Sequence, residues 1–508
     1  MILENGVIRT MDPSLPSVRA LAIAGAHVAG GVSTHEAALP SPDVVDLCGR
    51  CVLPGFTDSH VHFPTWSLSQ REVKLEGAGG LSEALEHVRT HPRHGSWIRG
   101  YGWRSAEWDE QPTAAALDAV TGYVPALLFS KDYHSAWLNS AALACAEGDL
   151  QVEGGVVERD ASDEPTGVLR EESAWQFRAR FAMPTEDEFV DATRVGLRIA
   201  ASRGVVAIHD KDGWLGSPGI FQRVAERAGL TLRVWQSSPY ERLPELAALG
   251  IHSGIGDAFL RIGYLKAFMD GTLGSRTAWM LDGSGVTITS GEELAGVIRE
   301  GARLGWPVGV HAIGDRANRE ALDAFESTRD VWAPLGLRHR IEHAQCLAPE
   351  DVSRFAALGV ACSVQFSHAP SDRDLAERFW PEQVDGAYAF RSLWESGALV
   401  ANGSDAPVEE LDPLAGIRAG VRRTTDDRPA WHPEQCLTIE EALTATCVTP
   451  AWLSGDERRR GKLLPGYLAD LVVLSRDALE CPVEELGTIQ VVATMVGGRW
   501  VHNPPPWD

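Results

Sequence analysis

Metal-capable side chains stand at the end of an early apolar run in this sequence. In PGFTDSHVHF (residues 54–63), His60 and His62 are two positions apart, shortly after the apolar residues 51–53. Residues i and i+2 of a strand point to the same face, so both imidazoles can be directed at one ion. Imidazole and carboxylate groups suit zinc and related divalent metals. The pair therefore indicates a metal site at the end of a strand.

Further side chains of this kind follow in separate segments, namely Lys266 in residues 260–271, His311 in 306–315, His343 in 337–345 and Asp405 in 399–407. Taken singly, each has an ordinary explanation. An isolated strand histidine is more often a hydrogen-bonded structural residue, and Asp405 could stabilise a turn. Their joint placement at strand ends favours one metal centre.

The elements that must position these residues form an alternating pattern. Eight short apolar segments are separated by stretches with helical spacing; they are residues 52–63, 205–210, 232–238, 260–271, 306–315, 337–345, 360–366 and 399–407. Eight β-then-α units predict an α/β fold of the TIM (β/α)8 barrel type. The carboxyl ends of such strands meet at one rim, where active sites form.

Both ends of the chain differ from this β-then-α pattern. They contain short runs in which apolar residues alternate, separated by glycines, which is typical of short strands. Neither end has enough strands for a stable sheet alone. We therefore expect residues 1–53 and 456–508 to form one composite β-sandwich beside a barrel of residues 54–455. The gap between the first two β segments predicts a large insertion, residues 66–204, at the carboxyl rim of the barrel.

The amino-acid composition limits the kind of partner that we expect this protein to bind. The chain has 46 basic and 70 acidic residues and a net charge of −24, which argues against nucleic-acid binding. It has no apolar run of about 18 residues and no signal-peptide pattern at its start, so we expect no membrane partner and a cytoplasmic location. The expected partner is a small-molecule substrate. A homodimer is a possible assembly.

Several of these segments together resemble the amidohydrolase superfamily of metal-dependent hydrolases. They are PGFTDSHVHF, VHAIGD with His311, IEHAQ with His343 and GSDAP with Asp405. More narrowly, LKAFMDGTLGSRTA (265–278) and SVQFSHAPSD (363–372) resemble the subgroup that includes N-substituted formamide deformylases. The resemblance spans nearly the whole chain. It implies a distorted (β/α)8 barrel with a composite β-sandwich, and hydrolysis of a C–N bond in an amide, formamide or cyclic amide.

The same resemblance implies one or two divalent metal ions, expected to be Zn²⁺. In this scheme one ion is bound by His60, His62 and Asp405, a second by His311 and His343, and a carboxylated Lys266 bridges them. A free lysine amine, with a pKa of about 10.4, is cationic near neutrality and would repel a metal, whereas a CO2 adduct is an anionic oxygen ligand. If Lys266 is unmodified, a single metal held by fewer ligands is the alternative.

The expected roles in catalysis and substrate binding follow from the same resemblance, since in the subgroup the stretches that hold Trp103 and His134 lie near the pocket. Asp405 is expected to accept a proton from the attacking water and pass it to the leaving nitrogen. Substrate contacts are predicted for Trp103 and His134 in the insertion and for His368 after the seventh β segment. For Trp103 the alternative is packing beneath a lid. The alternative functions are ester or lactone hydrolysis on the same scaffold, or metal binding without catalysis. The presence of Asp405 argues against metal binding without catalysis, because a purely structural site needs no open water position.

Overall fold

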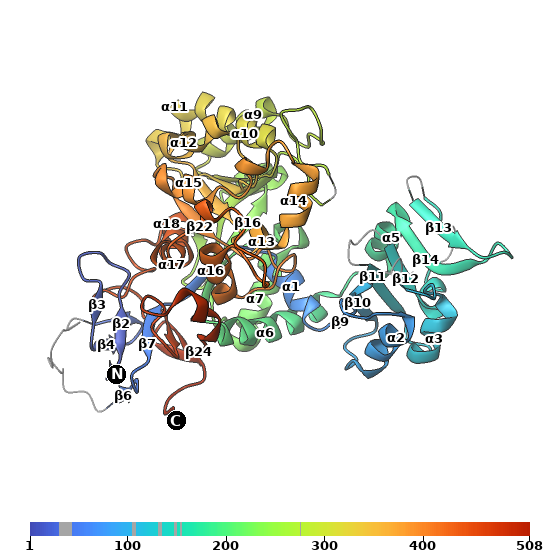
Figure 1. Ribbon diagram of the computed structural model, residues 1–508, viewed down its shortest axis with the longest axis horizontal. Helices are drawn as coiled ribbons and strands as arrows, with labels where there is room; N and C mark the ends of the chain where they lie inside the picture. Colours follow the sequence, from blue (N-terminus) through green and yellow to red (C-terminus); the bar gives the residue numbers. More distant parts are fainter. Residues whose placement is uncertain are drawn as a thin grey trace. The chain divides into compact units, whose positions relative to one another are not determined.

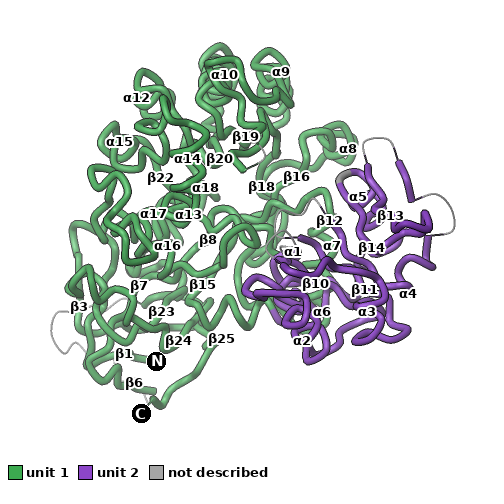
Figure 2. The backbone as a smooth tube through the Cα atoms, turned by 45° about the vertical axis from the view of Figure 1, so that its right-hand side comes forward, with its two compact units in different colours: residues 1–63, 196–508 green, residues 64–195 purple. Residues whose placement is uncertain are grey.

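The computed structural model describes residues 1–29, 43–103, 108–130, 135–146, 150–152, 155–274 and 276–507 (Figure 1). They form two compact units, residues 1–63 with 196–508 and residues 64–195 (Figure 2). Each unit has its own hydrophobic clusters, so each is described by itself. In the described part of the chain, no helix is long and apolar enough to span a membrane.

The larger unit is built around an almost closed barrel of eight parallel strands. In spatial order these are β8 (Phe56–Val61), β15 (Val205–Asp210), β16 (Arg233–Pro239), β18 (Leu260–Phe268), β19 (Val308–Ala312), β20 (Arg340–His343), β21 (Ala361–Val364) and β22 (Val400–Asn402). The short β17 (Ile255–Gly256) adds to β18 in antiparallel orientation. Each of the eight strands coincides with or overlaps one of the eight segments predicted from the sequence, so the predicted α/β barrel is confirmed.

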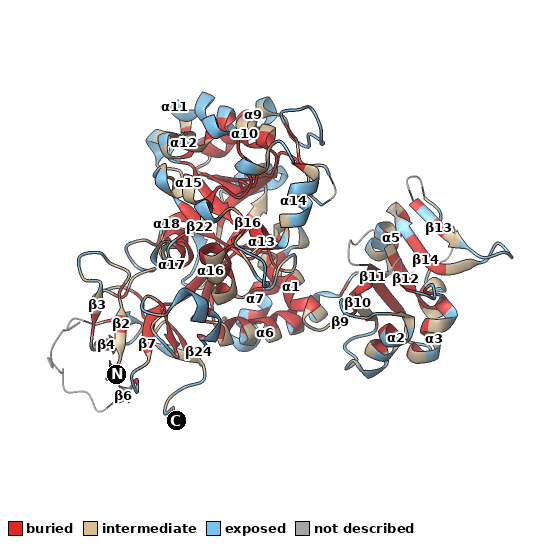
Figure 3. Ribbon diagram, in the orientation of Figure 1, coloured by how far each residue is buried: buried red, intermediate tan, exposed pale blue. Residues whose placement is uncertain are grey.

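Helices follow the strands, and the longer ones bury one face. They include α7 (Ser217–Ala228), α8 (Leu243–Ala248), α9 (Gly291–Arg303), α10 (Asp315–Ser327), α11 (Arg329–Trp332), α12 (Pro349–Leu358), α13 (His368–Ser371), α14 (Arg373–Phe379), α15 (Phe390–Glu395), α16 (Pro413–Arg422), α17 (Ile439–Cys447) and α18 (Thr449–Leu453). In α9, a capping box of Ser290 and Glu293 starts the helix, and Leu294 and Ile298 are buried on one face. The strands between the helices are buried almost throughout (Figure 3). This packing fixes the strand ends that carry the site.

Two further sheets of the larger unit involve the chain ends. One has the order β5 (His27–Val28), β4 (Leu21–Ala24), β1 (Ile2–Glu4), β6 (Val44–Asp46), and the other β25 (Arg499–His502), β24 (Val491–Val496), β23 (Leu471–Leu474), β7 (Cys51–Pro54), β2 (Val7–Arg9), β3 (Ser17–Val18). Strand β7 pairs with β2 on one side and with β23 on the other, so both chain ends contribute to one sheet. The boundaries at residues 53 and 456, and the sandwich arrangement itself, stay predictions.

The smaller unit, residues 64–195, has a sheet of its own. Its order is β13 (Gly155–Arg159), β14 (Pro165–Glu171), β12 (Ser135–Leu138), β11 (Ala126–Ser130), β10 (Ile98–Trp103), β9 (Val73–Lys74), with helices α1 (Phe63–Ser69), α2 (Leu81–Thr90), α3 (Ala114–Thr121), α4 (Ser140–Leu143) and α5 (Glu172–Phe177) along the same stretch. Successive residues of β11 enter two different hydrophobic clusters, so both faces of this sheet are covered. The insertion expected from the sequence runs to residue 204, whereas this unit ends at Val195, within α6 (Glu186–Ser202).

The barrel closes where the chain after β22 meets β8. The amide of Asp405 donates to the carbonyl of His60 at 2.7 Å, and the amide of His62 donates to Ala406 at 2.9 Å. Gly403 lies against the same stretch, and a Cβ atom there would lie only 2.4 Å from the backbone nitrogen of His60. Only glycine allows this close approach of two backbones.

We predict that Gly403→Ala lowers the free energy of unfolding by about 1–3 kcal/mol, the usual range for overpacking a buried site. Denaturant unfolding followed by circular dichroism measures this. The matched control is Gly296→Ala in the exposed middle of α9, where an added Cβ meets nothing within 4 Å. There alanine should stabilise by about 0.5–1 kcal/mol, because glycine is a poor helix former. Equal effects at the two positions would contradict the close-approach explanation.

Candidate metal centre

A cavity of about 410 Å³ opens at the carboxyl ends of the barrel strands. All six residues predicted as metal ligands contribute to its wall, together with His368, a predicted substrate contact; the set is His60, His62, Lys266, His311, His343, His368 and Asp405. The remaining wall consists of Phe268, Thr272, Leu273, Gly274, Ile313, Gln345, Asp372 and Val408. Residues from the ends of six strands, β8, β18, β19, β20, β21 and β22, and from the loops after them are thereby brought to one place.

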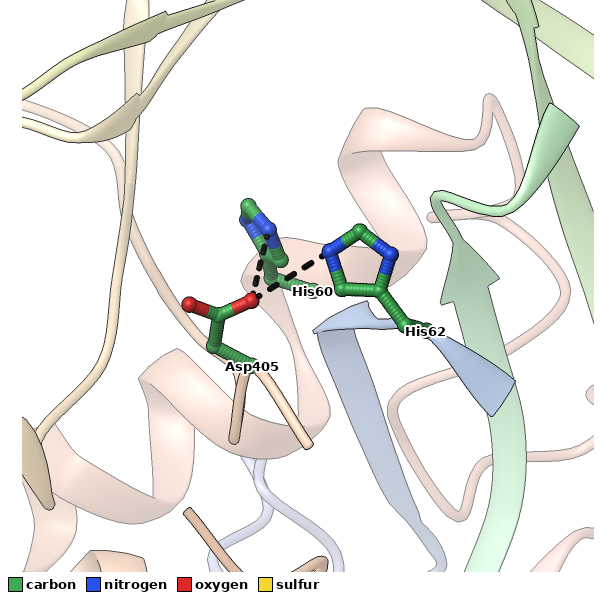
Figure 4. A group of neighbouring side chains, drawn as sticks. All are labelled: His60, His62 and Asp405. Atoms are coloured by element: carbon green, nitrogen blue, oxygen red, sulfur yellow. Dashed lines mark ion pairs between the residues drawn. The ribbon is translucent and has the colours of Figure 1, made fainter. Parts of the chain in front are cut away.

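The carboxylate of Asp405 lies at the centre of the potential ligand atoms. Its Oδ1 is 3.3 Å from Nε2 of His60 and 3.5 Å from Nε2 of His62 (Figure 4). Its Oδ2 is 3.9 Å from Nε2 of His368, which with His343 forms a second group around the same carboxylate. In each group of three, the ligand atoms lie within 4.8 Å of one another. His368 was predicted to contact substrate, and the geometry also makes it a potential ligand.

Each of the four predicted histidine ligands has one ring nitrogen bonded to an acceptor outside the cavity. The contacts are His60 Nδ1 to Glu342 Oε2 (2.9 Å), His62 Nδ1 to Asp212 Oδ1 (2.8 Å), His343 Nδ1 to Gln365 Oε1 (2.8 Å) and His311 Nε2 to the carbonyl of Gly271 (3.0 Å). Carboxylate, amide and carbonyl oxygens only accept, so the bonded ring nitrogen carries the hydrogen. The other ring nitrogen keeps its lone pair, as a metal ligand requires.

Burial sets the protonation of the site. It lowers the pKa of three of the histidines, His60, His311 (to about 3) and His343, which favours neutral imidazole near pH 7. For His62, burial acts in the same direction, but the charge and hydrogen bond of Asp212, together with the charges of Asp405 and Asp210, outweigh it and raise the pKa. For Asp405, burial raises the pKa, but His60, together with His343 and His62, more than offsets this and holds the pKa of the carboxyl well below its ordinary value. The donor set therefore contains three histidines whose neutral form is favoured, His62 with a raised pKa, and an ionised carboxylate.

Lys266 is the one predicted ligand that lacks a partner of its own. Its Nζ is buried and has no hydrogen-bond partner among the described residues. The ring of Phe268 lies 4.5 Å from it, and burial lowers the pKa of the amine to about 8. A buried unpaired amine is costly unless something else satisfies it. This orphaned nitrogen beside four imidazoles and a carboxylate fits a divalent metal held partly through a modified lysine.

Two of the site residues have left-handed backbone conformations. The φ angle is +74° at His343 and +59° at Asp405. Such angles in residues other than glycine cost about 1–3 kcal/mol each and persist where the surroundings enforce them. Consecutive strand residues normally point to opposite faces. The turn at His343 explains how its ring lines the cavity while Glu342, just before it, bonds to His60 inside the barrel.

Of the two residues of the insertion that were predicted to contact the substrate, the structure describes only Trp103. Trp103 belongs to the smaller unit, where its side chain is only 3% exposed. Its indole Nε1 donates to the carbonyl of Leu128 at 2.8 Å, and its ring packs near Trp108 and Trp137. This is a packing role; the role in substrate binding stays a prediction. His134 lies outside the described residues.

Several residues of the site were missed by sequence reasoning. They are Glu342, Asp212 and Gln365, which hold histidines, and Gln345 and Asp372 on the cavity wall. The signal for Glu342 was a charged residue in the middle of the buried run LRHRIEHAQ. No comparable signal marked Gln365, because a glutamine after a strand has many ordinary explanations.

The barrel and its rim of histidines and carboxylates are typical of metal-dependent hydrolases. The chain belongs to the amidohydrolase family, whose profile matches residues 43–502. Membership was expected from the sequence motifs and is confirmed by this match.

Individual relatives cover almost the whole chain. Protein LONG AFTER FAR-RED 3 of Arabidopsis thaliana is 31% identical over 99% of this chain and 91% of that protein. The N-substituted formamide deformylase of Arthrobacter pascens is 26% identical, with 98% and 97% covered. The crystal structure of an uncharacterized metal-dependent hydrolase from Pyrococcus horikoshii OT3 superposes with a TM-score of 0.81 at 28% identity, covering 95% and 99%. Together they support metal-dependent hydrolysis in general terms.

The hydrogen bond between Asp212 and His62 leads to a testable prediction. Asp212→Ala removes the partner of His62 Nδ1, so the affinity for a divalent metal should fall about 10–100-fold. Competition with a chromogenic chelator measures the affinity. Asp212→Asn keeps an acceptor oxygen and should restore most of it. Asp282→Ala, at an exposed turn whose carboxylate accepts from Ser284, is the control. An unchanged affinity in Asp212→Ala would show that this contact does not orient a ligand.

Proposed function

We propose that this protein hydrolyses a C–N bond in an amide, formamide or cyclic amide, using a divalent metal held by the cluster around Asp405. The observation that carries the proposal is the position of the Asp405 carboxylate, with the Nε2 atoms of His60 in β8 and of His62 just after it at 3.3 and 3.5 Å from one of its oxygens. This places an ionised base among the potential metal ligands and on the wall of a cavity of substrate size.

When bound, a divalent metal, for which we propose Zn²⁺, acidifies water and polarises a carbonyl group. One ion is proposed for His60, His62 and Asp405 and a second for His311 and His343. The low pKa of Asp405 keeps its carboxylate ready to accept a proton from the attacking water. After attack, the same carboxylate returns that proton to the leaving nitrogen. His368, 3.9 Å from Oδ2 of Asp405, is proposed to contact the substrate at this step.

Lys266 is proposed to carry a CO2-derived carboxylate. The neutral amine forms an N–C bond to CO2 and loses a proton, which leaves a carbamate with two oxygen ligands. The lowered pKa of Lys266 supports this, because it increases the neutral fraction of the amine at a given pH. The absence of any hydrogen-bond partner for Nζ in the described part of the chain leaves room for the adduct.

The proposed role of Asp405 as a proton donor favours a substrate with a nitrogen leaving group over one with an oxygen leaving group. An amine departs poorly without a proton, and Asp405 is placed to supply it. The relative from Arthrobacter pascens, a deformylase by name, also supports a C–N bond. Ester or lactone hydrolysis on the same scaffold remains the second candidate, because activated water attacks either carbonyl.

The test is a hydrolysis screen over N-formyl amines, N-acyl amino acids, cyclic amides and aryl esters, with metal content measured on the same sample. We expect turnover of at least one C–N substrate, its loss with a chelator and its return with zinc. Asp405→Asn should lower kcat by about 10²–10⁴-fold, the usual contribution of a general acid–base group. Asp282→Asn at the exposed turn should leave kcat unchanged.

Two outcomes would overturn the proposal. Turnover confined to the aryl esters would replace C–N hydrolysis by the second candidate. Undiminished turnover in Asp405→Asn, with metal content intact, would remove Asp405 from proton transfer.

A further inference from the structure

The cavity wall carries one carboxylate that the proposed chemistry leaves unused. Asp372 follows α13 directly, and its amide donates to the carbonyl of His368 at 2.8 Å. It is four residues after His368, a rise of about 6 Å along a helix. Asp372 belongs to neither of the two groups of potential metal ligands in the described part of the chain. It therefore lines the same cavity at a short distance from the metal centre, without being part of it.

The carboxylate of Asp372 is held by neutral donors on one oxygen only. The hydroxyl of Tyr388 donates to Oδ2 at 2.5 Å, and Nε2 of Gln345 lies 3.4 Å from the same oxygen. Gln345 also donates to the hydroxyl of Tyr388, which ties the two supports together. No described residue donates a hydrogen bond to Oδ1 of Asp372. One oxygen is fixed in place, and the other remains able to accept.

The position of Tyr388 is itself enforced. Its φ angle is +54°, its amide donates to the carbonyl of Gln345 at 2.6 Å, and its carbonyl accepts from Nη1 of Arg423 at 2.8 Å. Its ring is buried beside Phe390 and Trp431. A strained residue held from several sides is typical of sites whose geometry matters for function. The support behind Asp372 is therefore pre-organised, as binding residues require.

No cation of the described residues forms an ion pair with Asp372. Arg373, the next residue in the chain, pairs with Glu377. Arg428 pairs with Asp374 and Asp426, and Arg276 lies over the ring of Phe379 at 4.3 Å. A partly buried carboxylate without a counter-ion is unfavourable, so its retention in a cavity points to a ligand that brings the positive charge.

The rest of the wall limits what else the ligand contains. Beyond the metal-site residues it is largely apolar, with the side chains of Phe268, Leu273, Ile313 and Val408. We propose that Asp372 is a cation-binding subsite, which takes an ammonium or amidinium group of the substrate while an apolar part packs on these four side chains. The substrate class is then a small amide with a protonated nitrogen a few bonds from the scissile bond. That last step rests on the proposed function, whereas cation binding does not.

The experiment measures binding, and so is independent of turnover. Benzylammonium and benzyl alcohol, which have similar size and differ in charge, are titrated by calorimetry at pH 7 into the zinc-loaded protein. The wild type should bind benzylammonium at least tenfold more tightly than benzyl alcohol. Asp372→Asn should lose most of that preference and keep its affinity for benzyl alcohol, because it removes the charge and little volume. Asp374→Asn, two residues along and exposed, is the matched control and should behave as wild type.

A second variant tests the support of the carboxylate. Tyr388→Phe keeps the charge of Asp372 and removes the hydroxyl that fixes Oδ2, so we expect a smaller loss of cation preference. Equal binding of the two probes by the wild type, an undiminished preference in Asp372→Asn, or no detectable binding of benzylammonium would each overturn the proposal. If the hydrolysis screen finds no C–N substrate but the charge preference depends on Asp372, the proposed reaction fails and the cation subsite stands.

Discussion

The metal centre depends on the contacts made by the carboxylate of Glu342, which is buried inside the barrel. Its Oε2 accepts from Nδ1 of His60 at 2.9 Å, and its Oε1 accepts from Nζ of Lys211 and forms an ion pair with Nε of Arg340 at 2.9 Å. Burial alone would raise the pKa of Glu342, but Arg340 and Lys211 hold it well below its ordinary value. A buried carboxylate with these partners stays ionised, and removing one partner would leave an uncompensated charge, at a cost of about 3–5 kcal/mol. The lone pair of His60 is therefore directed at the cavity by the interior of the barrel.

The rim is built outward from this network. His343 follows Glu342 directly and has a left-handed backbone conformation, so that adjacent residues serve the interior network and the cavity. The backbone after β22 approaches β8 closely through Gly403, which brings Asp405 to His60 and His62. Backbone strain at the site is thus offset by hydrogen bonds and packing beneath it. This is the usual way in which a rigid barrel supports a reactive site.

Much of this arrangement was predictable from local pattern. The spacing of His60 and His62 indicated a shared strand face, and the eight apolar segments predicted the barrel, because both signals depend on neighbours in the sequence. The acceptors behind the histidines were not predictable in the same way. Asp212 bonds to a histidine 150 positions away, and Gln365 to one 22 positions away, so their roles arise only from the fold. In the sheet of residues 64–195, only residues 124–130, which overlap β11, were predicted as a strand; a strand as short as the two residues of β9 gives no periodic signal.

Carboxylation of Lys266 is the proposed step that would complete the metal centre formed with the histidines and Asp405. The most direct measurement is carbon NMR of the zinc-loaded protein prepared in ¹³C-bicarbonate, together with metal content per chain. We expect an enriched carbonyl signal from the wild type and from Lys74→Ala, an exposed control, and loss of this signal in Lys266→Ala together with a lower metal content. A wild type with no such signal, and a Lys266→Ala protein with the same metal content, would contradict this proposal.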